Sequence, residues 1–518
     1  MPFRTLDWTS ASTWKRHFIP LALLTGLSLL VRYWVDRIPI DDAYITFRHS
    51  VRLFQGLGWG YNNGSAVIAT STPLWTLILV PVSRYLPEVA RHLGILLDSA
   101  VPFVLYCSFY AVSKYIGLSL LVGFLYIFSP DTALCAPSGM EIPLFNLLLC
   151  LSVLSLQREW LKSATLCAAL LPLVRLDGLI FVALAWPFYL KKRSFPHIIF
   201  QVIPILLWYL YKAGLGEGSL LPSSLSGKIA TYSHYEGPSL GRLLGVLDYW
   251  TSLYFKTLNK DWIVNLPRAL LWLGLTVGGA SVLVKKSSPA FLLPLFSLLY
   301  SIACVLVSVP LFSWYYGPPT PGICIGVGAA LFLGAKEILP VGDGVKRLLP
   351  RLGTAFLLLM ALGGVLALYE FNHDRPPAWL GRVLFPNERE RANYECAKMI
   401  RRSLEEKPLV REPRILVHDL GVLGFYLPEA TLVDSAGIVS PEVVDYYREK
   451  PNARRFDFRE ELIDYVAPDF FVCAARHGPL KESWDSILLE YEEVGRATGE
   501  TWAYPYVIVC RKRERSPD

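Results

Sequence analysis

Long apolar runs fill the first part of the chain, and each predicts a helix that crosses a membrane. A crossing helix needs about 20 mainly apolar residues. Runs of about that length cover residues 18–35, 93–112, 197–213, 266–285, 290–310, 317–335 and 352–370. Shorter runs, some interrupted by Pro or Gly, cover residues 115–130, 142–157, 163–176 and 178–190. The pattern therefore predicts a polytopic α-helical membrane protein with about eleven transmembrane helices.

Positive charges between the runs indicate the orientation of these helices, because Lys and Arg collect in cytoplasmic loops. The basic clusters that alternate crossings bring to one side are 14–17, 191–193, 285–286 and 336–351. With these clusters inside, the first loop, 37–72, lies outside the membrane. The segment 72–88 is ambiguous, because it is short and carries Arg84. Eleven crossings result if it lies at the membrane interface; if it spans the membrane, a neighbouring short helix must be re-entrant. No small-residue cleavage site follows the first run, which predicts a retained helix rather than a signal peptide.

After residue 374 the apolar runs shorten to strand length and the share of charged residues rises. The run 388–404 has helical periodicity. Short apolar segments that read as buried strands are 414–419, 430–437, 469–475 and 506–513. We therefore predict two domains, a transmembrane catalytic domain over 1–374 and an extracytoplasmic soluble α/β domain over 375–518.

Composition agrees with this architecture. Of the 518 residues, 53% are hydrophobic and 18% charged, and 15 Trp, 27 Tyr and 26 Phe suit the aromatic belts of membrane interfaces. The net charge of +7 comes from short clusters between apolar runs, not from a basic stripe, so the partner is a lipid bilayer and no nucleic acid. The nine cysteines show no metal-binding spacing. Three of them lie in the tail, Cys396, Cys473 and Cys510, and allow at most one disulfide there.

Two adjacent carboxylates, Asp41 and Asp42, stand where the first apolar run ends. On a helix that starts near residue 41, Asp41, Tyr44 and Arg48 share one face, so a carboxylate and a guanidinium can point to one ligand. Repulsion between the two carboxylates can raise one pKa toward the range of a general base. A helix cap with a solvated carboxylate pair explains the same spacing equally well.

Further charged residues lie inside or beside apolar runs. Glu141 opens a helix in "SGMEIPLF" (138–145), where the helix dipole alone favours a carboxylate. Arg175 and Asp177 stand in "LVRLDGLIF" (173–181). A neutralising pair that holds two helices together is the simpler explanation for them, and contact with a ligand is the alternative.

Two more segments on the outer side carry candidate binding residues. The loop 216–237 holds Lys228 and His234, and Lys is a suitable partner for phosphate, although an ordinary solvated loop explains the pattern as well. Tyr315 and Tyr316 stand in "FSWYYGPPTPG" (312–322). Such rings form an aromatic belt in the simpler interpretation, and they stack on sugar faces in the functional one.

Together these features predict an enzyme that uses a membrane-borne phosphate donor, with a carboxylate that deprotonates an incoming hydroxyl and cations that stabilise the departing phosphate. A transporter or flippase for a lipid-linked glycan is the alternative. It should show inverted repeats with broken helices in matching halves, and the sequence has no such symmetry. An Asp pair also suits a divalent cation, Mg²⁺ or Ca²⁺, and the metal requirement stays open.

Several motifs in this order resemble those of bacterial GT-C glycosyltransferases that use polyprenyl-phosphate sugars. They are the stretch from Asp41 through "YNNGS" and "ATSTPLWTLILV", then "SGME", "RLDG", "LPSSLSGK", "WYYGPP" and "HDLGVLGFYLPEATLVDSAGIVSP". The likeness spans most of residues 18–445 and is greatest to the mycobacterial terminal arabinofuranosyltransferase type. It implies a GT-C-like fold in the bacterial inner membrane. It also implies inverting transfer, on the extracytoplasmic face, of a sugar such as arabinofuranose to an envelope glycan, lipid or protein.

The resemblance also implies roles for single residues. Asp41 matches the base of the first outer loop, and Asp42 beside it orients the acceptor or a cation. Glu141 should lie near the sugar, and Lys228 and Arg175 near the phosphate. The chain departs from the family at Ser223, where relatives often have Asn in an "LPN" loop. If the assignment holds, Asp41→Asn should abolish transfer and leave donor binding intact.

Overall fold

The computed structural model describes residues 11–35, 39–215, 262–306, 312–334, 386–450, 460–475, 489–498 and 506–513, with isolated positions between them. The chain divides into two compact units. The first, the helical unit, contains Met1–Arg37, Ala90–Trp208 and Gly237–Pro377, and the second, the α/β unit, contains Ile38–Val89, Tyr209–Glu236 and Ala378–Asp518. The domain boundary at 374–375 stays a prediction, and the structure adds that Ile38–Val89 belongs to the same unit as the C-terminal part of the chain.

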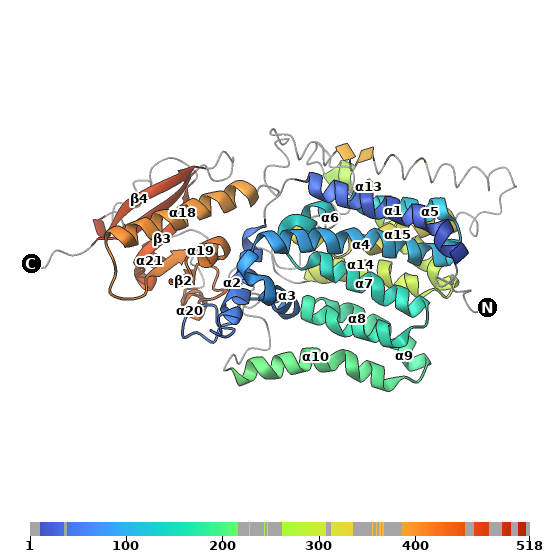
Figure 1. The fold of residues 1–518 in the computed structure, drawn as a ribbon, viewed down its shortest axis with the longest axis horizontal. Coiled ribbons are helices and arrows are strands. Elements are labelled where there is room, and N and C mark those ends of the chain that lie inside the picture. Colours follow the sequence, from blue (N-terminus) through green and yellow to red (C-terminus); the bar gives the residue numbers. More distant parts are fainter. Residues whose placement is uncertain are drawn as a thin grey trace, which may run out of the picture. The chain divides into compact units, whose positions relative to one another are not determined.

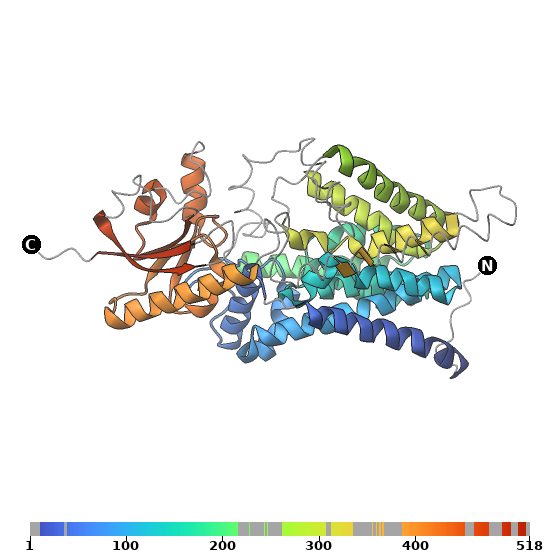
Figure 2. The same cartoon turned by 90° about the horizontal axis from the view of Figure 1, so that it is seen from above.

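Helices lie side by side in the helical unit (Figures 1 and 2). Their bounds are α1 (Ala11–Trp34), α4 (Glu88–Ser113), α5 (Ile116–Ile127), α6 (Pro130–Cys135), α7 (Ile142–Gln157), α8 (Leu161–Val174), α9 (Gly178–Lys191), α10 (Phe195–Gly214), α13 (Trp262–Lys285), α14 (Leu292–Leu306) and α15 (Thr320–Ala329). Each except α6, which follows the run 115–130, lies on an apolar run of the sequence, and the ends of α4 and α10 belong to the α/β unit.

Four described helices are long and apolar enough to cross a membrane: Lys15–Trp34, Glu88–Ser113, Phe195–Gly214 and Pro289–Leu306. A fifth span results if the pair Ile116–Ile127 and Pro130–Ser138, bent by 55°, counts as one. Helices α7, α8 and α9 are apolar but shorter, and 14 residues of α8 reach about 21 Å against a hydrocarbon core of about 30 Å. The run 352–370 lies largely outside the described residues, so the count of about eleven stays a prediction.

The segment 72–88 forms no membrane-length helix. It contains α3 (Pro73–Leu79) and the 3-10 helix η1 (Val80–Tyr85), of seven and six residues. Neither reaches the length of a span. The position of the segment relative to the bilayer stays a prediction.

A buried ion pair stabilises the break between α5 and α6. Nε of Arg32 lies 2.7 Å from Oδ2 of Asp98, and both side chains are almost fully buried. The guanidinium also donates to the carbonyls of Tyr126 and Ile127 at the end of α5 and to Oγ1 of Thr132 in α6. A broken helix inside a bundle leaves carbonyls without hydrogen-bond donors. Arg32 donates to two of these carbonyls. Arg32 and Asp98 were not among the residues predicted from the sequence.

The α/β unit is built on a sheet of five strands: β1 (Arg414–Val417), β2 (Thr431–Asp434), β3 (Phe470–Ala475), β4 (Tyr491–Thr498) and β5 (Tyr506–Lys512). Their order is β2-β1-β3-β5-β4. Strands β2, β1 and β3 are parallel, and β5 is antiparallel to both of its neighbours. The sequence predicted all of these strands except β4, whose sequence YEEVGRAT is too polar to read as a buried strand.

Helices cover both faces of this sheet (Figure 1). Alternate residues of a strand point to opposite faces, and Ile415 and Leu416 accordingly belong to two different apolar clusters. One cluster contains residues of α18 (Pro386–Glu406) and α19 (Leu420–Tyr426), and the other contains residues of α20 (Pro441–Glu449) and α21 (Glu460–Val466). Ile45 and Tyr61 join the first cluster, so the first outer loop is part of this core. All nine cysteines are free thiols.

Candidate functional site

The first carboxylate of the acidic pair binds the start of a helix in the α/β unit. Asp41 is the first residue of α2 (Asp41–Phe54) and is 6% exposed. Its Oδ2 accepts a hydrogen bond from the backbone N–H of Gly421 at 3.0 Å, and its Oδ1 accepts one from Val422 at 2.8 Å. Both donors lie in the first turn of α19, where free N–H groups and the helix dipole favour an anion. Asp41 therefore caps a helix from a distant part of the chain.

Arg48 binds the other end of the same helix. Its Nη1 donates to the carbonyls of Gly424 and Leu427, the latter at 3.2 Å, and Nη2 donates to Ala430 at 3.1 Å. Its Nε donates to the carbonyl of Tyr61 at 2.9 Å. These contacts leave the side chain 3% exposed. They do not support the predicted contact between Arg48 and the donor.

The lengths of α2 and α19 explain why Asp41 and Arg48 reach the two ends of α19. Seven residue steps from Asp41 to Arg48 correspond to about 10.5 Å along α2, which is about the length of the seven-residue α19. Between the two charges, the ring of Tyr44 lies 5.5 Å from that of Phe425. The predicted common face of Asp41, Tyr44 and Arg48 is thus confirmed, and it faces α19.

Two glycines of α19 allow this close approach. A Cβ atom on Gly421 would lie 1.8 Å from the carbonyl oxygen of Asp41, and one on Gly424 would lie 2.0 Å from Oη of Tyr61. No larger residue fits either position without movement of the backbone or the ring. The spacing of the two glycines in "LGVLG" was a signal that the sequence analysis did not use.

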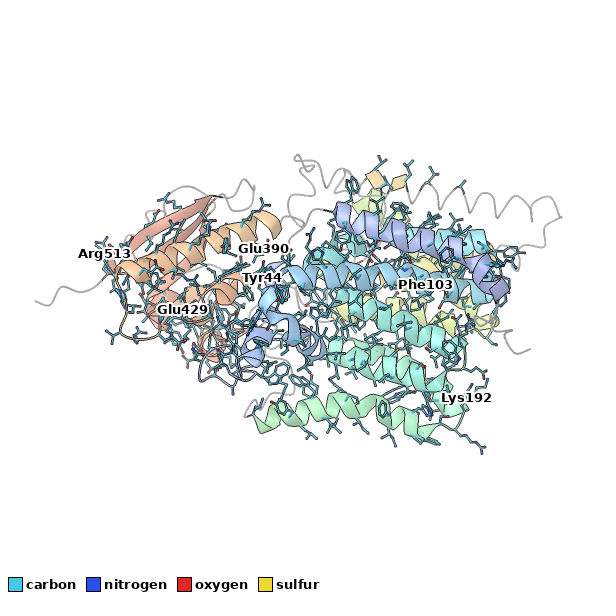
Figure 3. All side chains as sticks on the ribbon, in the orientation of Figure 1. Tyr44, Phe103, Lys192, Glu390, Glu429 and Arg513 are labelled. Carbon is cyan, nitrogen blue, oxygen red and sulfur yellow. The ribbon has the colours of Figure 1, made fainter. Side chains whose placement is uncertain are left out.

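A second buried carboxylate, Glu390 of α18, completes the surroundings of Asp41. Its Oε1 accepts a hydrogen bond from the backbone N–H of Asp41 at 3.0 Å, and its Oε2 has no hydrogen-bond partner among the described residues. Figure 3 shows Glu390 and Tyr44 near each other. Burial raises the pKa of Glu390 to about 7. Burial also raises the pKa of Asp41, against the opposing effects of Arg389 and the two N–H donors.

Asp42 differs from its neighbour in exposure. Its side chain is only partly buried, whereas that of Asp41 is buried. Successive residues of an α-helix point about 100° apart. Asp42 therefore does not share the direction of Asp41 toward α19.

The second predicted outer loop is only partly described. Lys228, His234 and Ser223 lie outside the described residues. Gly227 is described, and a Cβ atom on it would lie 2.8 Å from the carbonyl oxygen of Gly437 in the loop after β2. Both of the predicted outer loops thus contain residues that approach segments following parallel strands of the sheet.

In the helical unit, three of the predicted residues form one ion cluster. Nη1 of Arg175 lies 2.6 Å from Oε1 of Glu141, and Nη2 lies 2.9 Å from Oδ2 of Asp177. Glu141 precedes α7, whereas Arg175 and Asp177 occupy the turn between α8 and α9. The ring of Tyr315 is centred 5.6 Å from Cζ of Arg175.

The aromatic segment 312–322 is held near this cluster by a hydrogen bond to its backbone. Tyr315 and Tyr316 belong to the 3-10 helix η4 (Ser313–Tyr316), and both are partly exposed. The ring of Trp314 stacks on that of Phe312 at 4.7 Å. Nδ2 of Asn146 in α7 donates to the carbonyl of Gly317 at 3.3 Å, which ties the segment to the helix that Glu141 precedes.

Metal ligands are not assembled in the part of the chain that the structure describes. No group of three or more His, Cys, Asp or Glu residues there could hold an ion. The sequence left the metal requirement of the Asp pair open, and this arrangement adds no support for Mg²⁺ or Ca²⁺ there.

Comparison with known proteins shows a shared fold. No protein-family model and no curated protein matches the sequence. The solved structure of ArnT from Cupriavidus metallidurans bound to undecaprenyl phosphate matches with a TM-score of 0.57 at 13% identity, over 97% of this chain and 98% of that one. This chain has the fold of ArnT. The apo structure of ArnT gives a TM-score of 0.55 at 14% identity, over the same shares of both chains.

A third match is too weak to argue from. The arabinofuranosyltransferase AftD from Mycobacteria aligns with 96% of this chain and 40% of its own length, with a TM-score of 0.43 at 15% identity. The specific likeness to arabinofuranosyltransferases therefore stays a prediction.

Proposed function

We propose that the chain is a GT-C glycosyltransferase that transfers a sugar from a polyprenyl phosphate to an envelope glycan, lipid or protein. One observation carries the proposal: the acidic pair opens a helix, α2, that is anchored by charge to α19, in a chain with the fold of ArnT. ArnT was solved with undecaprenyl phosphate bound. Such a donor suits a protein of the bacterial inner membrane with its site on the extracytoplasmic side.

Asp42 is the general base in this proposal, and Asp41 is a positioning residue. Both carboxylate oxygens of Asp41 accept hydrogen bonds from α19, which leaves this buried side chain poorly placed to meet an acceptor hydroxyl. Asp42 is more exposed and is the next residue. This exchanges the roles that the sequence resemblance implied.

The reaction transfers one proton and exchanges one bond at the anomeric carbon. The acceptor hydroxyl oxygen attacks the anomeric carbon while its proton passes to the Asp42 carboxylate. The bond from the anomeric carbon to the phosphate oxygen breaks, and its electron pair leaves with polyprenyl phosphate. A single displacement of this kind inverts the anomeric configuration.

A deletion strain tests this function. Mass spectrometry of its envelope glycans and lipids should show an acceptor that lacks one sugar, and a plasmid with the intact gene should restore that sugar. A plasmid that carries Asp42→Asn should not restore it. A missing sugar with lipid-linked sugar accumulated on the cytoplasmic leaflet would instead favour a flippase.

A further inference from the structure

We propose that Glu141, Arg175, Asp177 and Tyr315 form a subsite for sugar hydroxyls, not for phosphate. The inference rests on the proposed function, because it concerns which part of a lipid-linked sugar these residues contact. It differs from the role that the sequence resemblance implied for Arg175.

The charges of the cluster do not favour a phosphate group. Arg175 donates from Nη1 to Glu141, and from Nε and Nη2 to Asp177, at 2.6 to 3.1 Å for the closest contact of each nitrogen. All three nitrogens of the guanidinium therefore have a carboxylate partner. The ion pair with Asp177 alone balances the positive charge of the guanidinium. The cluster therefore carries no net positive charge that would attract a phosphate group.

The same groups suit a neutral ligand with hydroxyls. The side chain of Asp177 is 22% exposed, so its carboxylate can accept hydrogen bonds from outside the cluster. Hydrogen bonds to an ionised acceptor are stronger than those between neutral groups. The partly exposed ring of Tyr315 offers a flat apolar surface beside it.

A buried hydroxyl points to the same ligand independently. Tyr300 of α14 is 3% exposed, and no described residue forms a hydrogen bond with its Oη. It lies within electrostatic range of Arg175, Asp177 and Tyr315. A buried polar group without a partner is rare in folded proteins. A sugar hydroxyl beside Asp177 would supply that partner.

The frame of the subsite is already assembled. Glu141, Arg175 and Asp177 stand at the ends of three helices, and Asn146 fixes the aromatic segment through Gly317. A site whose side chains are held before binding loses less entropy when it takes its ligand.

Binding measurements with defined lipids test the inference. Full-length protein in detergent would be titrated with undecaprenyl phosphate and with the same lipid phosphate carrying a panel of pentoses and hexoses. The wild type should bind at least one sugar-bearing lipid roughly 10-fold more tightly than the bare lipid. Asp177→Asn and Tyr315→Leu should each remove most of that preference and leave the affinity for bare undecaprenyl phosphate within about 3-fold.

Two controls separate the outcomes. Tyr115→Leu removes a ring that is 51% exposed in the same unit and should leave both affinities unchanged. Arg175→Gln should also spare the bare lipid, and a loss of its affinity of roughly 10-fold would place phosphate here and overturn the inference. A sugar preference that is absent in the wild type, or that survives in both variants, would overturn it as well. Failure of the wild type to bind undecaprenyl phosphate at all would instead contradict the proposed function.

Discussion

Two clusters of the molecule combine carboxylates with a buried arginine, and they satisfy these charges in opposite ways. In the α/β unit, Asp41 and Arg48 bind the backbone at the two ends of α19. In the helical unit, Arg175 binds two carboxylates directly. The first arrangement uses all of its charge to hold two helices together. The second retains a partly exposed carboxylate, Asp177, so it can still act on a ligand.

The comparison predicts that the two neighbouring aspartates respond differently to the same substitution. Asp42→Asn should lower turnover by about 100- to 10,000-fold, the usual contribution of a general base, and leave thermal stability unchanged. Asp41→Asn should retain measurable turnover and lower stability by about 1–3 kcal/mol, because one amide group faces the N–H groups of α19. Purified protein, assayed for transfer and for its melting temperature, separates these effects. The reverse pattern would return the base to Asp41.

Arg48 should stabilise the fold, whereas Arg175 is assigned to a ligand subsite. Arg48→Met leaves the carbonyls of Gly424, Leu427 and Ala430 without their donor and should lower the stability of the α/β unit by about 3–5 kcal/mol. Thermal unfolding in detergent measures the loss. Arg448→Met, which removes an arginine whose side chain is 73% exposed, is the matched control and should change little. Full stability of Arg48→Met would refute the anchoring of α19.

Sequence patterns predicted the arrangement of residues within a helix, but they did not predict contacts between distant segments. The start of α2 at Asp41 and its common face followed from spacing alone. The partners of that face did not, since Gly421 lies 380 residues further along the chain. Arg175 and Asp177 are only two positions apart, so their pairing was predictable, whereas the approach of Glu141 and Tyr315 depends on tertiary packing.

The close contact at Gly421 gives a smaller and more local effect. Gly421→Ala places a Cβ atom against the carbonyl of Asp41 and should lower stability by about 1–3 kcal/mol, as overpacking usually does. It should also reduce turnover by displacing the acidic pair. Gly214→Ala adds the same atom where no other lies within 4 Å and serves as the control. Equal turnover and melting temperature in the two variants would show that the approach of α2 to α19 is not tight.

Glu390 should make the free energy of unfolding of the α/β unit depend on pH. This dependence does not involve the Arg175 cluster. Burial raises the pKa of Glu390 from 4.5 to about 7. A carboxyl with a raised pKa favours the folded state most below pH about 4.5, and this contribution is lost as the pH rises through about 7. Between pH 5.5 and 6.5 the free energy of unfolding should therefore fall by about 1 kcal/mol. Hydrogen exchange of the α19 amides in the full-length protein measures this fall, and Glu390→Gln, which keeps an acceptor for the N–H of Asp41, should flatten it. A slope that persists in Glu390→Gln would assign the effect to Asp41, whose pKa is raised by the same burial.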